Sequence, residues 1–426
     1  LEALFAAVER HDTPEKVAEN DHMMKCAMRV VLTVRGGVAP SADVLVTHLV
    51  QILQLTARNV SNPRFTQFLF ETLSAVVRFA GSGSAAEVHA MEERLFPVFT
   101  EVLQADIAEY VPYVFQVLAQ LLEAHAAHDK QRVLPGSYAS LLPPLLMPAL
   151  WEQKGNVPAL VRLLKAYLAQ APGYFVEQAR VEPCLGIYQK LISSRLNDVF
   201  GFDLLRALLR VLPAEVMAPY LQAVRTLMLV RLQASKTEKF SQQFCAFFGA
   251  FCGVQQPAYP EQVVASFESI QPGLFAQIVE NVVVPDLPKL TAAQRFGTVA
   301  GLVRLLTESD AMLTTQAGVW PTLAAGVARL LMQTTAPDAA RDDDAELDEQ
   351  GFQASFTQLA AAAPPRDTDD NAAAWAGADV AAYFARQLAA ASARRPGTLP
   401  PLLERMPADA AEVMRQVVAQ HGVVLS

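Results

Sequence analysis

The chain has 426 residues, of which 52% are hydrophobic and only 18% are charged. This composition excludes a chain that is disordered throughout, because it offers ample apolar side-chain surface to bury in a core. The 34 Lys and Arg residues against 43 Asp and Glu residues give a net charge of −9. This balance argues against a nucleic-acid-binding protein, which needs a basic face to neutralise phosphates. It favours either basic partners or simple solubility.

The two longest uncharged stretches are Val133–Trp151 and Phe240–Pro260. The first is interrupted by prolines and the second by Gln, Ser and Gly, whereas a membrane-spanning helix needs about 20 predominantly apolar residues. We therefore expect no membrane insertion. Charged residues follow closely on Leu1, which predicts no signal peptide, and the absence of an initiator Met suggests a fragment.

Apolar residues recur at helical spacing along most of the chain, and the alternation typical of strands is almost absent. The clearest helical faces carry these residues: Val111, Val114, Phe115, Leu118, Leu121 and Leu122; Leu160, Leu163, Leu164, Tyr167 and Leu168; Leu204, Leu205, Leu208, Leu209 and Leu212. Asp106, Asn156 and Asp198 precede these faces and are expected to cap the helices by accepting a hydrogen bond from free amides. Pro63 and Pro158 suit a first helical turn.

The helix starts recur at a regular spacing. They fall near the following residues: Asn20, Asn62, Asp106, Asn156, Asp198 and Lys236. A recurrence of roughly 40–50 residues, with a second helix between each pair of starts, is typical of HEAT or armadillo solenoids. The sequence thus predicts an all-α HEAT-repeat superhelix over residues 1–335, with roughly eight to nine helical hairpins in all. The alternative is an irregular helical domain whose spacing is coincidental.

The pattern changes after residue 335. Residues 336–350 are dense in carboxylates and have no apolar face, which predicts a solvated inter-repeat loop. Residues 351–426 are expected to form helices that cap the solenoid. We expect a short helix around Phe352–Leu359 and Ala-rich helices near Val380–Ala391 and Ala408–Val418.

The chain carries none of the Gly-rich phosphate-binding, nucleophile-elbow or zincin motifs, so we expect neither an enzyme nor a bound cofactor. His125, His128 and Glu123 could share one side of a helix, but a metal site needs a further ligand that the sequence does not supply. A polar helix end is the favoured interpretation. The four cysteines (Cys26, Cys184, Cys245 and Cys252) are too scattered for a disulfide framework, and the two seven residues apart suit one buried helical face.

The acidic run is the one surface feature that suggests a partner. Its carboxylates are Asp342, Asp343, Asp344, Glu346, Asp348 and Glu349. The run lacks the Gly and the terminal Glu of an EF-hand calcium loop. Two interpretations remain, a solvated loop or an electrostatic contact for a basic partner, and under the second these six residues are the predicted partner-binding residues.

Several stretches resemble a known family. They are FPVFTEVLQADIAEYVPYVFQVLAQLLEAH at 96–125, WEQKGNVPALVRLLKAYL at 151–168, LGIYQKLISSRLNDVFGFDLL at 185–205, RLQASKTEKF at 231–240, SIQPGLFAQIVENVVVPDL at 269–287 and GFQASFTQLA at 351–360. In this order they are similar to the C-terminal half of the importin-α re-exporters, the CAS/CSE-type exportins of the importin-β (karyopherin) superfamily. The resemblance covers about residues 27–360. It departs from the family at 129–136 and after Ala361.

The resemblance implies a specific function, which the composition and the helix spacing alone do not predict. It implies a nuclear export receptor that binds importin-α together with Ran-GTP, passes nuclear pore proteins and shuttles between nucleus and cytoplasm. The N-terminal arch of such a receptor would precede Leu1, and this chain would be the C-terminal arch. No nucleic acid, membrane insertion or small-molecule substrate is expected. The alternative is a generic HEAT-repeat scaffold, from another karyopherin or a regulatory subunit.

Overall fold

The computed structural model describes residues 1–255, 259–331, 334, 358–362 and 372–423. Every regular element among these residues is a helix, and none of them forms a strand. The chain divides into two compact units. The N-terminal unit comprises Leu1–Lys190 with Asp342–Arg366, and the C-terminal unit comprises Leu191–Arg341 with Asp367–Ser426. Each unit is described by itself below.

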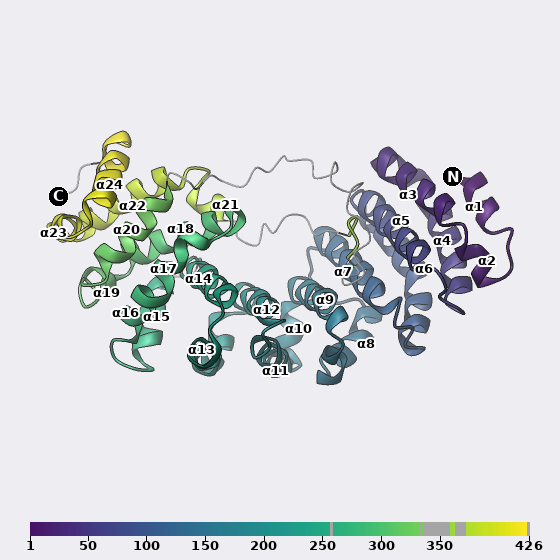
Figure 1. The fold of residues 1–426 in the computed structure, drawn as a ribbon, viewed down its shortest axis with the longest axis horizontal. Coiled ribbons are helices and arrows are strands. Elements are labelled where there is room, and N and C mark those ends of the chain that lie inside the picture. Colours follow the sequence, from purple (N-terminus) through teal and green to yellow (C-terminus); the bar gives the residue numbers. More distant parts are fainter. Residues whose placement is uncertain (256–258, 332–333, 335–357, 363–371, 424–426) are drawn as a thin grey trace. The chain divides into compact units, whose positions relative to one another are not determined.

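The N-terminal unit is built of helices joined by short turns (Figure 1). They are α1 (Glu2–Val8), α2 (Pro14–Ala18), α3 (Asp21–Val34), a 3-10 turn (Arg35–Ser41), α4 (Ala42–Thr56), α5 (Pro63–Gly81), α6 (Ala85–Gln104), α7 (Val111–His128), α8 (Gly136–Leu145), 3-10 turns (Pro148–Glu152 and Lys154–Asn156), α9 (Val157–Gln170), α10 (Pro172–Glu177) and α11 (Val181–Ile192).

These helices form two layers. Helices α3, α5, α7 and α9 pack side by side in chain order, and α2, α4 and α6 pack side by side in a second layer. We call the first the B layer and the second the A layer. The two layers also contact each other through helices that are neighbours in sequence, as in α4–α5, α5–α6 and α6–α7. Helical hairpins stacked in this way bury one face only against the next hairpin, as the repeat spacing predicts.

Hydrogen bonds between successive repeats have the spacing of the repeat itself. Tyr113 donates its hydroxyl to Gln67 Oε1 at 2.8 Å across 46 residues. Ser74 donates to Gln120 Oε1 at 2.8 Å, also across 46 residues. Each bond joins neighbouring B-layer helices at the same height. The predicted recurrence is therefore a real structural period, and the all-α HEAT-repeat fold class is confirmed.

The helix start predicted at Asn62 is confirmed, but none of the three residues predicted to cap a helix does so. Asn156 stands at the N-cap position of α9, and its side chain makes no capping hydrogen bond. Asn62 caps α5, and its side chain accepts from the amides of the residues two and three positions on, at 3.1 and 3.3 Å. Asp106 does not cap α7, because it adopts a positive φ of 48° in a turn and the helix begins at Val111. Asp198 is the first residue of its helix, and its carboxylate pairs with Arg231.

The C-terminal unit continues with the same kind of element. Its helices are α12 (Asp198–Val211), α13 (Ala214–Ser235), α14 (Glu238–Cys252), α15 (Tyr259–Glu268), α16 (Leu274–Ile278) continued by a π-helical turn (Val279–Val283) into α17 (Val284–Asp286), a 3-10 turn (Leu287–Lys289), α18 (Ala292–Glu308), α19 (Asp310–Leu313), α20 (Trp320–Leu331), α21 (Ala372–Ala376), α22 (Val380–Arg394), α23 (Leu399–Glu404) and α24 (Ala408–Gln420). Thr237, one residue after the predicted start at Lys236, caps α14.

Helices α12, α14, α18 and α22 form one row of this unit, and α14 and α18 approach most closely. A Cβ atom built on Gly301 of α18 would lie 1.9 Å from the carbonyl oxygen of Gly249 in α14. A Cβ atom on Gly249 would lie 2.6 Å from the Cα atom of Thr298. The two backbones therefore touch, and only residues without a side chain fit at this crossing.

The two Ala-rich helices predicted near the end of the chain are confirmed. The Ala-rich segments form α22 and α24, and α22 packs on α18 while α24 packs on α20. Phe384 and Leu388 of α22 are fully buried in this contact. The short helix predicted around Phe352–Leu359 lies outside the described residues, apart from residues 358 and 359, which are not helical. The predicted ends of the solenoid, at residue 335, and of the acidic loop, at residue 350, also lie outside the described residues.

The run Asp21–Thr56 is long and apolar enough to match a membrane-spanning helix in length and composition. In the fold this run is two helices, α3 and α4, separated by the 3-10 turn at Arg35–Ser41. The two helices lie in different layers, and Val31 and Leu49 are completely buried. Apolar residues in this run are thus part of the core between the layers.

Candidate partner-binding site

The six acidic residues predicted to bind a partner lie outside the described residues. They are Asp342, Asp343, Asp344, Glu346, Asp348 and Glu349. Their role remains a prediction. The residues that follow them at 358–362 are described, and they belong to the N-terminal unit.

Residues 358–362 lie against the B layer of the N-terminal unit, where Figure 1 shows them as a short yellow-green trace beside α7. The segment is not helical: its backbone bends at Ala360 and turns at Ala361–Ala362. Three successive amides, those of residues 359, 360 and 361, donate to side-chain oxygens of α5 and α7. The B layer thus holds this segment by its backbone.

Glu71 of α5 makes the central contact. Its Oε1 accepts from the amide of Ala360 at 2.7 Å, and its Oε2 accepts from the amide of Ala361 at 2.9 Å. The residue is only 7% exposed, so its carboxylate has left bulk water. Burial raises the pKa of the Glu71 carboxyl, and the two amides oppose that rise. A buried carboxylate needs donors of this kind, because an unpaired charge is costly in the interior.

Two glutamines hold the first part of the segment. Gln116 of α7 accepts from the amide of Leu359 at 2.9 Å and donates to the carbonyl of Pro112, one helical turn back, at 3.0 Å. Gln67 of α5 donates to the carbonyl of Gln358 at 3.3 Å. Its own oxygen accepts from Tyr113, and burial, with Glu71 nearby, raises the pKa of that phenol to about 12. Contacts within the N-terminal unit therefore orient the side chains of Gln116 and Gln67 independently of the segment.

Arg162 of α9 holds the other end of the segment and donates to the carbonyl of Ala362. Its guanidinium is itself held by Glu123 of α7 through two bonds, Nε to Oε1 at 2.9 Å and a terminal nitrogen to Oε2 at 2.7 Å. A bidentate pair of this kind fixes the plane of the guanidinium. We call Gln67, Glu71, Gln116 and Arg162 the backbone clamp.

Three side chains of the segment, those of residues 359, 361 and 362, are small or apolar and buried. Leu359 and Ala361 are each 1% exposed, and Ala362 is completely buried. The backbone clamp accordingly selects a short stretch in which an apolar residue is followed by small ones. The sequence analysis did not predict this site. A signal was present, since Glu71 and Gln116 are polar residues inside the apolar runs FLFETL and VFQVL.

The three side chains considered as metal ligands do not converge. His125 Nδ1 lies 3.4 Å from Glu92 Oε2, and this contact raises the pKa of the imidazole. His128 Nε2 lies 3.0 Å from a backbone carbonyl of α5, and Glu123 pairs with Arg162. Among the described residues no group of three His, Cys, Asp or Glu side chains is placed to hold a metal ion. The polar helix end is the interpretation that the geometry supports.

The two cysteines of α14 lie on its buried face, as predicted. Cys245 and Cys252 are both fully buried, and burial raises the pKa of each thiol. Cys245 Sγ lies 3.5 Å from the carbonyl of Val283. A buried thiol with a raised pKa is a poor nucleophile, so these residues act as core side chains.

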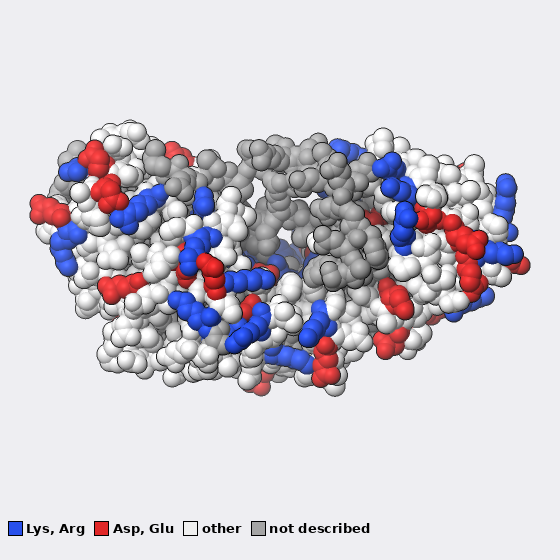
Figure 2. All heavy atoms as spheres, in the orientation of Figure 1, with Lys and Arg blue, Asp and Glu red and all other residues white. Residues whose placement is uncertain are grey.

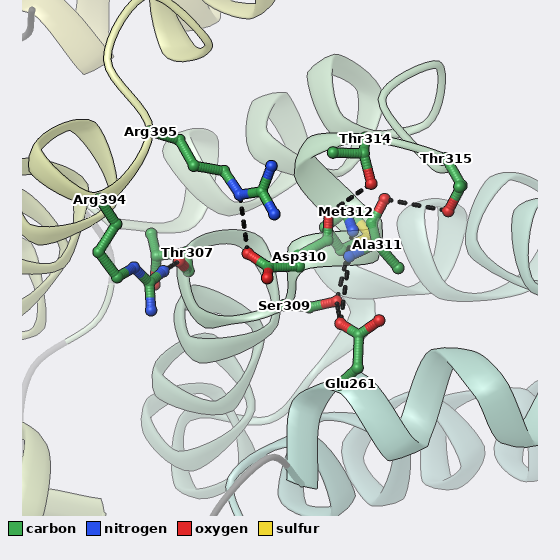
Figure 3. A network of polar contacts seen from close by, with 10 residues as sticks. All are labelled: Glu261, Thr307, Ser309, Asp310, Ala311, Met312, Thr314, Thr315, Arg394 and Arg395. Atoms are coloured by element: carbon green, nitrogen blue, oxygen red, sulfur yellow. Dashed lines mark hydrogen bonds and ion pairs between the residues drawn. The ribbon is translucent and has the colours of Figure 1, made fainter.

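A second polar network ties α22 into the C-terminal unit (Figure 3). Arg395, just after α22, pairs with Asp310 at 2.9 Å, and Arg394 donates to the carbonyl of Thr307 at the end of α18. Glu261 of α15 accepts from the hydroxyl of Ser309 at 2.6 Å and from the amide two residues further on at 3.1 Å. The turn between α18 and α19 is thereby held from both sides.

The C-terminal unit also has an apolar pocket of about 240 Å³ between α12, α13 and α15. It is lined by Leu209, Leu212, Ala214, Glu215, Met217, Ala218, Leu221, Tyr259 and Gln262. A concave site lined mainly by apolar side chains can receive an apolar side chain of another molecule. It is a second place at which the described residues could contact a partner.

The charged side chains on the face shown in Figure 2 are of mixed sign, with Lys and Arg lying among Asp and Glu over both units. Ion pairs between charged side chains also join neighbouring helices. Arg94 of α6 pairs with Asp43 of α4 at 2.6 Å, and Arg329 of α20 pairs with Asp409 of α24 at 2.8 Å. Exposed pairs of this kind add little stability, so they serve mainly solubility and register.

Stacked helical hairpins of this kind define a helical-repeat protein. Residues 1–417 match the family model described as CAS/CSE protein, C-terminus. The chain therefore belongs to the CAS/CSE family, the family of exportins that the quoted stretches resemble.

Individual relatives agree with this assignment. The chain is 38% identical over 373 residues to the importin-alpha re-exporter of Schizosaccharomyces pombe, which covers 84% of this chain and 38% of the relative. It is 39% identical to exportin-2 of Pagrus major and 36% identical to exportin-2 of Homo sapiens, each over 350 residues, 80% of this chain and 35% of the relative. The chain thus spans well under half the length of these relatives.

A solved structure has the same fold. The structure titled "The exportin Cse1 in its cargo-free, cytoplasmic state" aligns with a TM-score of 0.81 at 26% identity and covers 98% of this chain and 42% of that one. Exportins of this family are transport receptors with a karyopherin-type fold of helical repeats, and this chain has that fold.

Proposed function

We propose that this chain is the C-terminal part of a nuclear export receptor. The receptor binds importin-α cooperatively with Ran-GTP in the nucleus, carries it past nuclear pore proteins and releases it in the cytoplasm. The observation that carries the proposal is the match of residues 1–417 to the CAS/CSE family, together with relatives named importin-alpha re-exporter and exportin-2. In this role the chain binds and releases proteins and catalyses no reaction.

The fold suits such a role. Each hairpin contacts only its neighbours, so small changes at successive repeats add up to a large change of the binding surface at low cost. The coupling between importin-α and Ran-GTP is then a reciprocal binding free energy, typically about 1–3 kcal/mol. Such a coupling corresponds to a change in affinity of about 5- to 150-fold.

Binding of importin-α tests this proposal. Its affinity is measured for this chain and for the full-length polypeptide that contains it, with Ran-GTP, with Ran-GDP and without Ran. We expect Ran-GTP to tighten binding to the full-length polypeptide by at least about five-fold, because cooperative ligands raise each other's affinity. Binding that is indifferent to Ran-GTP contradicts the exportin proposal and favours a generic HEAT-repeat scaffold.

We further propose that the acidic residues contribute an electrostatic contact for a basic partner. Seven carboxylates and one Arg fall between Asp338 and Glu349, so this stretch holds most of the net charge of −9. A concentration of one sign of charge raises the association rate of an oppositely charged protein and makes that rate sensitive to salt.

Substitution of Asp342, Asp343 and Asp344 by Asn tests this contact. We expect the association rate with importin-α or Ran to fall and its dependence on ionic strength to weaken, while the dissociation rate changes little. A matched control replaces three exposed acidic residues elsewhere, Glu2, Asp12 and Glu19, by their amides. If both triple variants associate at the wild-type rate at low salt, the stretch is only a solvated loop.

A further inference from the structure

The backbone clamp is a complete binding site whose ligand is a piece of the same chain. It consists of three side-chain acceptor atoms for three successive amides and two side-chain donors for carbonyls at either end of the segment. The clamp residues come from α5, α7 and α9, and the segment comes from more than 190 residues further along the chain. The N-terminal unit is therefore shaped around a peptide that its own helices do not supply.

The contacts recognise backbone and size rather than one particular side chain. Every hydrogen bond from the backbone clamp to the segment goes to a main-chain amide or carbonyl. The buried side chains at 359, 361 and 362 are one Leu and two Ala. Any peptide with an apolar residue followed by small residues, and without Pro at the three donating positions, offers the same groups.

The buried carboxylate of Glu71 requires the hydrogen-bond donors that such a peptide supplies. Glu71 is buried in the middle of α5, and apart from Gln67 the donors to its carboxylate are the two amides of the segment. Successive main-chain amides form a natural anion-binding group, as in the nests that bind phosphates and carboxylates. When the segment leaves, Glu71 loses both donors, so a second peptide that supplies them is favoured in its place.

We propose that the backbone clamp is a peptide-binding site that the chain occupies with its own residues 358–362, and that a partner segment of the same pattern enters when those residues leave. The chain's own segment is covalently attached, so its binding is intramolecular and outcompetes a free peptide at low concentration. In the partner-free chain the site is consequently occupied in cis. This proposal concerns the N-terminal unit alone and does not depend on the transport function.

The test uses a fluorescent peptide with the sequence of residues 352–366, FQASFTQLAAAAPPR, and the full chain. In the chain, Leu359→Asp and Ala361→Asp place charges at two positions that are each 1% exposed and so expel the internal segment. We expect fluorescence anisotropy to show the peptide binding this released variant at least ten-fold more tightly than the wild-type chain.

Two controls separate backbone recognition from non-specific adsorption. A peptide methylated on the amide nitrogens of the residues equivalent to Ala360 and Ala361 lacks only the two donors to Glu71, and we expect it to bind at least ten-fold more weakly. Adding Glu71→Ala to the released variant should weaken the unmodified peptide to a similar extent. Equal binding of the methylated and unmodified peptides overturns the proposal, as does equal binding to the released and wild-type chains.

A second measurement covers the case in which the released variant fails to fold. In the otherwise native chain, amide hydrogen exchange at residues 359–361 reports occupation of the site directly. We expect slow exchange in the wild-type chain and at least ten-fold faster exchange in the Glu71→Ala variant, with α4 and α6 unchanged. Fast exchange at these amides in the wild-type chain would show that the site is not occupied in cis and would overturn the proposal.

Discussion

The crossing of α14 and α18 leads to the sharpest prediction about stability. Substituting Gly301 by Ala adds one methyl group at a position where a Cβ atom would lie 1.9 Å from the carbonyl oxygen of Gly249. Carbon and oxygen atoms in close helix contacts lie about 3.3 Å apart or more, so the helices must separate by about 1.4 Å. The obstructing atom is backbone, and no side-chain rotation can relieve the clash.

The magnitude follows from two opposing terms. Forcing an extra methyl group into a close-packed contact typically costs about 1–3 kcal/mol, and a clash with backbone lies at the upper end. Replacing Gly by Ala inside a helix returns about 0.8–1.0 kcal/mol through helix propensity. We therefore expect Gly301→Ala to lower the unfolding free energy of the C-terminal unit by about 2 kcal/mol.

The matched control is Gly186→Ala in α11. Gly186 is also inside a helix, but a Cβ atom there would meet nothing within 4 Å. The same substitution should stabilise this helix by about 0.5–1 kcal/mol, since only the propensity term acts. Hydrogen exchange across a urea series measures the opening free energy of α18 and of α11 separately, without assuming that the whole chain unfolds in one step. Equal effects at the two sites would refute the close approach of the helices.

Three further predictions concern other features of the fold. Asp198→Ala should lower the unfolding free energy by about 3 kcal/mol, because it removes a buried carboxylate that lies 3.2 Å from the guanidinium of Arg231, itself 6% exposed. A loss below about 1 kcal/mol in urea unfolding would contradict this. His125, whose pKa Glu92 raises, should contribute about 1 kcal/mol of stability below its unfolded pKa of about 6.5 and lose it as pH rises through the folded value. The difference in unfolding free energy between wild type and His125→Gln, measured from pH 5.5 to 8.5, should shrink with rising pH, and a constant difference would speak against the pair. Asn62→Ala should cost about 1–2 kcal/mol, because it removes both the α5 cap and the bond that Asn62 Nδ2 donates to the carbonyl of Ala18 at 2.8 Å. Asn62→Asp keeps the cap and loses only the second bond, so thermal unfolding should place it between Asn62→Ala and the wild type.

Much of the fold was predictable because helical repeats are local in sequence. The apolar periodicity of Leu160–Leu168 and the spacing of helix starts depend only on neighbouring residues and on a regular repeat, and both were confirmed. The failures were local too. Asp106 has the chemistry of a cap, but it lies in a turn with positive φ, and α7 begins five residues later. A single sequence does not show which of several polar residues meets the first free amide.

The candidate site was not predictable in the same way. Glu71 and Gln116 were visible as polar residues within apolar helices, but nothing nearby identified their ligand. That ligand follows Glu71 in the chain by 289 and 290 residues and Gln116 by 243. Only the first part of that ligand lies in the stretch GFQASFTQLA at 351–360, which resembles the family and in which residues 352–359 were predicted to form a short helix.

The sequence by itself determined the class of structure and the family, because helix periodicity, repeat length and ordered family stretches are all properties of contiguous residues. It also located the densest charge, at Asp342–Glu349. Only the tertiary structure decided that a buried carboxylate on α5 is satisfied by two amides from the far end of the chain, and that α14 and α18 meet backbone to backbone. Contacts of this kind depend on which surfaces the stacking of hairpins brings together, and the physical requirement that a buried charge be hydrogen-bonded acts only once they have met.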